Sequence, residues 1–218
     1  MKGCKFMAKA VFFDLDGTLT DSGEGIINCV SYTLGEFGLP IPSREALRVF
    51  VGPPLRESFV KFGVPADQAD EAVKVYRSRY IHVGIYENFP YPGIEEVLKN
   101  LKEQGHRLFV ATSKPEWMAV KVLEKFELAH YFERICGAAM DGVRDQKSAV
   151  IAYLLEQVGG VDEAIMIGDT KFDVIGANAH SIPTIGVSWG YGTVEEMEAA
   201  GAKAIAHTMD DLFRLINE

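Results

Sequence analysis

Two aspartates that directly follow a short apolar segment are the residues whose types and spacing most clearly suggest chemistry. Asp14 and Asp16 come after the uncharged run 10–13, Ala-Val-Phe-Phe, and Gly17 follows them. Such a run predicts a strand buried on both faces of a parallel sheet, and ligands bind at the carboxyl ends of these strands. Because neighbouring carboxylates repel each other, the pair indicates a divalent cation, a proton-transfer role, or both.

An Asp-rich turn that ends a strand is the plainer interpretation, because Asp and Gly are ordinary turn residues. A calcium-binding loop also begins Asp-x-Asp-Gly, but it needs a preceding helix and further oxygen ligands. Here a strand is expected before the motif, and Leu19 and Gly25 stand where ligands would be needed. The calcium loop is therefore excluded, and the rest of the chain must decide between a turn and a catalytic pair.

The segment 14–19, Asp-Leu-Asp-Gly-Thr-Leu, resembles the first motif of the haloacid dehalogenase-like phosphohydrolase superfamily. The resemblance implies that Asp14 is a nucleophile and that Asp16 is a general acid and base. It also implies that a Thr or Ser, a Lys and another acidic cluster follow along the chain. Each of these can be sought in the sequence independently.

The composition limits the class of protein. With 218 residues, 48% of them hydrophobic, the chain can bury the core of one large domain or of one domain with an insertion. A net charge of −9 argues against nucleic-acid binding, and no apolar stretch approaches the length of a membrane span. The 3 cysteines are far apart, which favours a reduced, cytoplasmic setting. The oligomeric state stays open between a monomer and a weak dimer.

Strand-like runs alternate with helical patterns along most of the chain. The strands are expected at 8–14, 107–112, 134–138, 164–169 and 184–187. Apolar residues at helical spacing predict helices over 94–101 and 119–126, and Ser113 with Glu116 forms a capping-box pattern before the second helix. This alternation predicts an α/β fold with a doubly wound, Rossmann-like parallel sheet.

One long segment departs from the alternation. Residues 22–91 have a helical pattern interrupted by turns rich in Gly and Pro. A crossover between parallel strands needs far fewer residues. We therefore expect an inserted helical cap at 22–91 and a Rossmann-like catalytic core formed by 1–21 and 92–218. Superfamily members with a similar arrangement use the cap as a lid.

Thr112 is expected at the end of a strand, at the same edge of the sheet as Asp14. Ser113 and the free N–H groups of the next helix suit an anion, although a Thr-Ser pair in this position is more often a plain helix cap. The resemblance implies that the Thr112 hydroxyl binds a phosphoryl oxygen. Ser113 and Gly17 are expected to bind the substrate.

Lys147 stands on the buried stripe of a predicted helix that also carries Val150, Ile151 and Leu154. It is also near the helix N-terminus, where the helix dipole disfavours a cation. Extension of the side chain past the sheet edge to solvent is one explanation. The other is a pairing with Asp14 and a substrate phosphate, which matches the third motif of the superfamily.

A further carboxylate ends another predicted strand. Asp169 follows the run Ile-Met-Ile-Gly, and Asp173 lies one helical turn later. Several carboxylates beside one lysine indicate a cation, and ligation by oxygen with several waters suits Mg²⁺. The metal site that the resemblance implies consists of Asp14, Asp16, Asp169 and Asp173. Asp169 would be a direct ligand, and Asp173 would act through a water or from behind a direct ligand.

These residues predict a Mg²⁺-dependent phosphomonoester hydrolase that acts on a small phosphorylated metabolite through an aspartyl-phosphate. The leading substrates are phosphoglycolate and a 5′-nucleotide. The sequence around Lys147 lacks the Lys-Pro of many members and looks closer to the 5′-nucleotidase-like group. A phosphosugar mutase would share every core residue, and a catalytically silent binding protein is disfavoured by the intact motifs.

Two other features complete the list of candidates. Arg56 follows a Gly-Pro-Pro turn in the predicted cap; a lone Arg there is more often a solvated surface residue, but the resemblance places a specificity loop nearby. The segment 186–190 fits the Gly-x-Ser-x-Gly pattern of hydrolases with a serine nucleophile. No His follows the acidic residues downstream of it, so it is interpreted as a loop beside the site.

Overall fold

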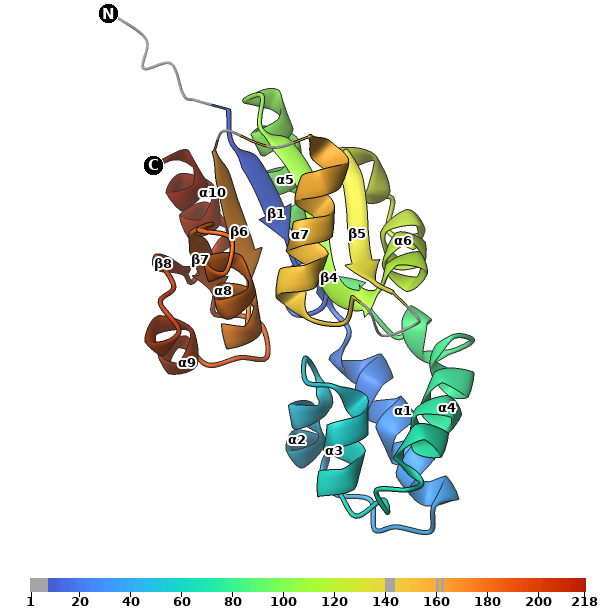
Figure 1. Ribbon diagram of the computed structural model, residues 1–218. Coiled ribbons are helices and arrows are strands. Elements are labelled where there is room, and N and C mark those ends of the chain that lie inside the picture. The colour runs from blue at the N-terminus through green and yellow to red at the C-terminus, as the bar shows by residue number, and fades with distance from the viewer. Residues whose placement is uncertain (1–7, 140–143, 160, 162) are drawn as a thin grey trace, which may run out of the picture. The chain divides into compact units, whose positions relative to one another are not determined.

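Six parallel strands form the main sheet of the part of the chain that the structure describes. The structure is a computed structural model that describes residues 8–139, 144–159, 161 and 163–218 (Figure 1). The strands are β1 (Ala10–Phe13), β4 (Arg107–Pro115), β5 (Arg134–Ala138), β6 (Ala164–Gly168), β7 (Thr184–Val187) and β8 (Ala204–Ala206). Their order in the sheet is β5-β4-β1-β6-β7-β8.

The strand order is that of a doubly wound sheet. From β1 the chain proceeds outward to β4 and β5, returns across the sheet to β6, and proceeds outward again to β7 and β8. The accompanying helices are α5 (Ile94–Glu103), α6 (Glu116–Lys125), α7 (Lys147–Val158), α8 (Lys171–Asn178), α9 (Val194–Ala199) and α10 (Met209–Asn217). A short 3₁₀ turn, η3 (Ala129–Tyr131), precedes β5. The predicted α/β, Rossmann-like fold is confirmed.

Helices cover both faces of the sheet. In Figure 1, α7 and α8 lie in front of the strands, and α5 lies behind them. The helix α7 packs on β4 and β5, and α8 packs on β6 and β7. Because both faces are covered, the central strands are apolar and fully buried, as in other parallel sheets.

The alternation of side chains along β1 decides which face receives its last residues. Ala10 and Phe12 belong to the core cluster that α7 completes with Val150, Ile151 and Leu154. Residues two apart on a strand share a face. The next residue in this series is Asp14, so the strand delivers a carboxylate toward the start of α7.

A second compact unit, Thr20–Phe89, is inserted between the segment that ends at Leu19 and the segment Pro90–Glu218. Its elements are β2 (Thr20–Asp21), α1 (Gly23–Glu36), α2 (Arg44–Leu47), η1 (Arg48–Phe50), α3 (Leu55–Lys61), α4 (Ala69–Tyr80) and η2 (Gly84–Tyr86). Aromatic rings fill its core: Phe50 packs against Phe59 and Phe62 with ring centroids 5.1 and 4.8 Å apart. The sequence analysis put this insertion at 22–91, and its role as a lid stays a prediction.

The chain enters and leaves the inserted unit through two short strands that pair with each other, β2 and β3 (Phe89–Pro90). The N–H of Tyr91 then donates to the carbonyl of Leu19 at 3.1 Å. The two crossings of the chain are therefore held together by backbone hydrogen bonds, so the insertion begins and ends at one place.

Two local predictions differ from the structure. The strand β8 is only 3 residues long, too short for its apolar pattern to be noticed. The predicted capping box is wrong: Ser113 lies inside β4, and α6 begins at Glu116 with Pro115 as its cap and no side-chain cap bond. The strand continues beyond Thr112 because it contains a bulge, described below.

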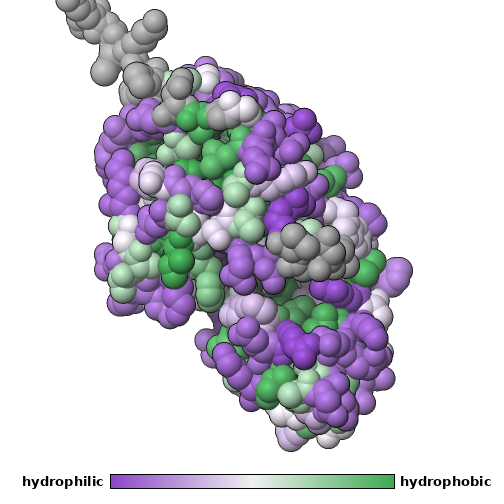
Figure 2. Space-filling model, viewed as in Figure 1, coloured by the Kyte–Doolittle hydropathy of each residue, from purple (hydrophilic) through white to green (hydrophobic). Residues whose placement is uncertain are grey.

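Hydrophilic residues cover much of the surface that one view shows. The face seen in Figure 2 is mostly hydrophilic, with apolar side chains scattered over it. None of the helices in the described part of the chain has the length and apolar character needed to cross a membrane.

Candidate active site

Three buried carboxylates meet at the carboxyl ends of β1 and β6. One carboxylate oxygen from each of Asp14, Asp169 and Asp173 lies within 4.8 Å of the other two. Asp14 is 9% exposed, and the other two are fully buried. Asp14 follows β1, Asp169 follows β6, and Asp173 lies in the first turn of α8. The parallel pairing of β1 with β6 brings them together.

One buried ammonium group lies among these carboxylates. Lys147 Nζ is 2.9 Å from Asp14 Oδ1 and 2.7 Å from Asp173 Oδ1, and it donates to the carbonyl oxygen of Ala111 at 3.0 Å. Lys147 is the first residue of α7 and is 6% exposed. With three acceptors around three donor hydrogens, the ammonium is fully bonded, although it lies at the unfavourable end of the helix dipole.

Small residues and backbone donors hold Asp169. The hydroxyl of Thr18 donates to Asp169 Oδ1 at 3.2 Å, and the N–H of Tyr191 donates to Oδ2 at 2.8 Å. Gly17 has φ = +85°, and a Cβ there or at Gly190 would overlap the Asp169 side chain. The loops that follow β1 and β7 therefore need glycine to approach this carboxylate closely.

Burial and neighbouring negative charges make the carboxyl groups of Asp14 and Asp169 harder to ionise. Burial, opposed by Lys147 and reinforced by Asp173, raises the pKa of Asp14 to about 6. Burial, with the charges of Asp173 and Asp14, raises the pKa of Asp169 well above its ordinary value. Burial alone would lower the pKa of Lys147, but the charges of Asp14 and Asp173 outweigh it and the pKa is raised.

The carboxylate of Asp16 lies elsewhere. It is paired with Lys114, whose Nζ lies 2.8 and 3.0 Å from its two oxygens, and it is not among the clustered carboxylates of the described residues. The expected place of Asp16 among the metal ligands stays a prediction. In the structure its carboxylate is paired with a lysine at the end of β4 to which the sequence analysis gave no role.

Both oxygens of Asp173 have partners, which limits what this residue can do. Oδ1 faces Lys147, and Oδ2 accepts the N–H and the hydroxyl of Thr170 at 3.0 and 2.8 Å. The bond from the Thr170 N–H is one half of the capping box of α8, in which the Thr170 side chain accepts the N–H of Asp173. Asp173 is thus placed to orient Lys147.

The other predicted residues of the site fall into two groups. Thr112 is 1% exposed; its hydroxyl bonds to the Asp14 carboxyl and also accepts the N–H of Lys114 at 3.2 Å. Ser113, in contrast, is exposed. Arg56 is in the first turn of α3 in the inserted unit, has a side chain that is 54% exposed, and forms an ion pair with Asp70.

Three residues of this site escaped the sequence analysis: Thr18, Lys114 and Tyr191. Thr18 stands inside the first motif, so its position was a usable signal. Tyr191 acts through its backbone N–H, which no side-chain pattern reveals. Lys114 is two residues from Thr112 and lies in a bulge of β4, and its contact with Asp16 spans 98 residues of sequence.

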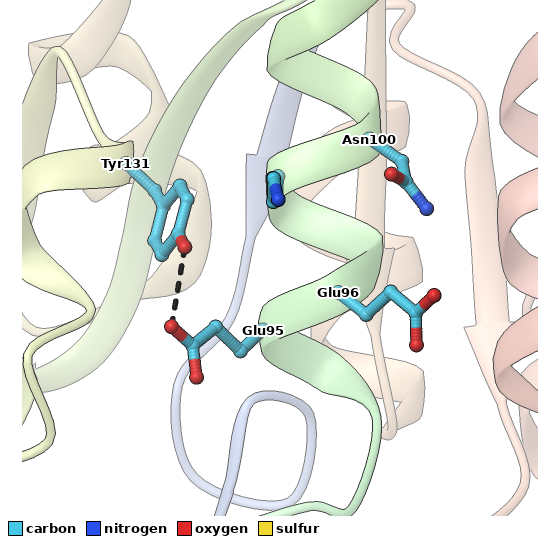
Figure 3. A pocket seen from close by; sticks show the side chains of 5 residues that line it. Glu95, Glu96, Asn100 and Tyr131 are labelled. Atoms are coloured by element: carbon cyan, nitrogen blue, oxygen red, sulfur yellow. Dashed lines mark hydrogen bonds between the residues drawn. The ribbon is translucent and has the colours of Figure 1, made fainter.

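A surface pocket of about 300 Å³ lies beside α5 (Figure 3). Glu95, Glu96, Lys99, Asn100 and Tyr131 line it, and the hydroxyl of Tyr131 donates to Glu95 at 3.2 Å. None of the residues described above contributes to it. Its acidic lining does not suit a phosphorylated ligand.

Comparison with known proteins shows the family of this chain. A family model described as haloacid dehalogenase-like hydrolase matches residues 11–187. The chain belongs to this family. The match runs from β1 to β7 and so includes every residue of the carboxylate cluster.

Several curated relatives are similar over most of this chain. A 5′-nucleotidase of Pseudomonas aeruginosa is 40% identical over 87% of this chain and 86% of its own. A tyrosine-protein kinase, PtkA, of Mycobacterium tuberculosis is 40% identical over 93% of this chain and 70% of its own. A phosphoglycolate phosphatase of Caulobacter vibrioides is 32% identical over 93% of this chain and 88% of its own.

A solved structure supports the same assignment. A predicted phosphatase from Clostridium acetobutylicum has a TM-score of 0.91 and 43% identity, covering 96% of this chain and 98% of that one. With the family match and the phosphatases among its relatives, this chain is a phosphatase of the haloacid dehalogenase-like family.

The raised pKa of Asp14 predicts a specific pH dependence of stability. In metal-free protein the folded state binds this proton more tightly than the unfolded state, because the pKa is about 6 against an ordinary 3.8. The free energy of unfolding should therefore fall as pH rises through this window, by about 3 kcal/mol from Asp14. Urea unfolding of the protein in chelator, from pH 4 to pH 8, measures the fall.

Asp14→Asn should remove this part of the fall, since the amide does not titrate. Asp67→Asn, at an exposed position of the inserted unit, is the matched control and should keep the wild-type profile. An Asp14→Asn profile with the full wild-type fall would show that the Asp14 carboxyl is not held protonated by the fold.

Proposed function

We propose that this phosphatase hydrolyses phosphomonoesters with Mg²⁺ as its cofactor and Asp14 as its nucleophile. The observation that carries the proposal is the position of Lys147, which bonds to Asp14 and Asp173 inside a buried carboxylate cluster. A nucleophilic carboxylate must approach a phosphate dianion, so positive charge has to be supplied beside it. Lys147 supplies one such charge.

The carboxylate cluster suits a divalent cation as a second source of positive charge. Asp14, Asp169 and Asp173 offer hard oxygen donors within 4.8 Å of one another, against one ammonium group. Asp14 and Asp169 would hold Mg²⁺, while Asp173 is already bonded to Lys147 and Thr170. When bound, Mg²⁺ would neutralise the phosphoryl oxygens and favour the ionised form of the carboxylates.

Several contacts hold the carboxylate of Asp14 in place. Asp14 Oδ1 accepts the N–H of Leu15 at 2.7 Å and faces Lys147 Nζ at 2.9 Å. The Thr112 hydroxyl also bonds to this carboxyl group, so its orientation is restricted before the attack on phosphorus. In the first step an oxygen of Asp14 forms the bond to phosphorus, and the bond from phosphorus to the ester oxygen breaks.

Asp16 handles the protons of both steps. Its carboxylic acid gives a proton to the ester oxygen as that oxygen leaves, and the resulting carboxylate then takes a proton from the water that attacks the aspartyl-phosphate. Inorganic phosphate is released and Asp14 is regenerated. Thr112 and the backbone around Gly17 would hold the phosphoryl oxygens, and Ser113 would contact the rest of the substrate.

The substrate that we propose is a small phosphorylated metabolite, with a 5′-nucleotide and phosphoglycolate as the first two to test. Relatives named for each of them are 40% and 32% identical to this chain. The relative named as a kinase is as similar as the 5′-nucleotidase, and a phosphosugar mutase would also use these residues. In both of these the phosphoryl group passes to another hydroxyl, whereas a hydrolase releases inorganic phosphate.

Substitution of the two aspartates tests the mechanism. With p-nitrophenyl phosphate and Mg²⁺, Asp14→Asn should abolish turnover because an amide cannot attack phosphorus. Asp16→Asn should lose roughly 10²- to 10⁴-fold in kcat, the usual contribution of a positioned acid or base. Phosphate release by wild-type protein should stop in chelator and return with Mg²⁺.

Both variants should remain folded, and a far-UV spectrum and a melting curve provide that control. Full turnover by Asp14→Asn would refute the assignment of the nucleophile. Undiminished turnover by protein shown to contain no divalent metal would refute the metal requirement without touching the assignment of Asp14.

Arg56 is proposed as a residue that selects the substrate. It is exposed and carries its charge in the first turn of α3, where Asp70 is its partner. A substrate carboxylate, hydroxyl or second phosphate could replace that partner. Arg56→Ala should then reduce kcat/KM for the metabolite at least tenfold more than for p-nitrophenyl phosphate, which offers no such group.

A panel of phosphorylated metabolites, assayed with both proteins, measures this difference. Arg48→Ala is the matched control, because Arg48 is also an exposed arginine of the inserted unit with an acidic neighbour, Glu45. Equal losses on all substrates, or none on any, would remove Arg56 from substrate selection.

A further inference from the structure

Lys114 is a buried cation whose position none of the catalytic motifs explains. Its side chain is 5% exposed, whereas the Asp16 side chain that it contacts is 20% exposed. The single ammonium group reaches both oxygens of that carboxylate, at 2.8 and 3.0 Å. A two-point contact of this kind restricts rotation of the carboxylate, and burial of the lysine keeps water from competing for it.

Lys114 lies in a bulge of β4. Ala111 pairs with Cys136, but Pro115 pairs with Ala138, so three residues of β4 lie opposite Gly137 alone. Extra residues in one strand bend it and change the direction of its side chains. Ser113 is exposed while Lys114, the next residue, is buried, and the Lys114 N–H donates to the Thr112 hydroxyl at 3.2 Å.

The bulge is fixed from the neighbouring strand. A Cβ on Gly137 would overlap the backbone of Lys114 and Glu116, so only glycine permits this approach. The Glu116 carboxylate accepts the N–H of Gly137 at 3.2 Å and pairs with Arg144 at 3.3 Å, and Arg144 also donates to the Gly137 carbonyl at 2.8 Å. The backbone that carries Lys114 is thus held by several charged and backbone contacts.

We propose that Lys114 is a positioning residue for Asp16. By its two-point contact it holds the Asp16 carboxyl group beside the cluster of Asp14, Asp169 and Asp173 but outside it. There Asp16 can exchange protons with the ester oxygen and with water instead of becoming a further ligand of the cation. This inference rests on the proposed function, because it assigns Lys114 a task only if Asp16 serves as acid and base.

The proposal differs from a role in substrate binding in a measurable way. If Lys114 acts through Asp16, its loss should matter most when the ester oxygen needs a proton in order to leave. An alkyl phosphate such as ethyl phosphate has a poor leaving group, while p-nitrophenolate leaves with little assistance. A lysine that bound the substrate directly would instead change KM and would affect kcat without regard to the leaving group.

A double-mutant cycle provides the decisive test. We expect Lys114→Met to lower kcat on ethyl phosphate by roughly 10²-fold, as for a catalytic group displaced by about 1 Å, and to lower kcat on p-nitrophenyl phosphate less than tenfold. KM should change little. Because Lys114 acts only through Asp16, the double variant with Asp16→Asn should be no slower than Asp16→Asn alone.

The matched control is Arg107→Met, which removes another two-point ion pair, with Glu133, from the opposite end of the same strand. It should retain wild-type kcat on both substrates. If Lys114→Met unfolds, Lys114→Gln, which keeps a donor but no charge, replaces it in the cycle. Melting curves of every variant identify any loss that comes from unfolding.

Additive losses in the cycle, equal losses on both substrates, or an effect confined to KM would overturn the proposal. A wild-type kcat for Lys114→Met, together with a reduced kcat for Asp16→Asn, would also overturn the proposal. In that case the proposed function would stand. If Asp16→Asn itself retains full activity on ethyl phosphate, the assignment of Asp16 in the proposed function fails and that of Lys114 fails with it.

Discussion

The contact of one buried ammonium group with two buried carboxylates is the constraint on which the rest of the site depends. Lys147 Nζ lies 2.9 Å from Asp14 and 2.7 Å from Asp173. All three side chains are buried and so are shielded from water. Removal of one member of a buried ion pair leaves an uncompensated charge, which typically costs about 3–5 kcal/mol. Even with Lys147 in place, burial and repulsion hold the pKa of Asp14 near 6. The cluster therefore remains short of positive charge, and this shortage suits a cation.

The fold supplies this arrangement through the register of parallel strands. Strands β4, β1 and β6 are neighbours, so the residues that follow them lie side by side at one edge of the sheet. The strand alternation turns Asp14 to the face covered by α7, and the apolar stripe of α7 brings Lys147 to meet it. Glycines at 17 and 190 then let two loops close around Asp169. Each of these steps follows from the sequence locally, but their result depends on strand pairing between distant segments.

Much of this could be predicted from the sequence because strong patterns carry it. Asp14 and Asp169 follow apolar runs of strand length, and Lys147 lies at helical spacing from three core residues. The Lys114–Asp16 contact could not be predicted, since it joins two segments that are 98 residues apart in the sequence. The contacts of Asp169 with Thr18 and the Tyr191 backbone join segments about 150 and 22 residues away. Such contacts between distant segments leave no periodic signal in the sequence. The contact of Asp16 with Lys114 left none either, so Asp16 was expected among the clustered carboxylates.

The central claim is that Asp14 forms a covalent bond to phosphorus. The most direct measurement is to quench wild-type enzyme with acid during steady turnover of a phosphomonoester with Mg²⁺ and to map the phosphorylated peptide by mass spectrometry. The account predicts acid-trapped phosphate on the peptide that contains Asp14, and none on that peptide in Asp14→Asn. Phosphate found on another residue, or an unphosphorylated Asp14 peptide when a pre-steady-state burst shows that a phosphoenzyme accumulates, would contradict it.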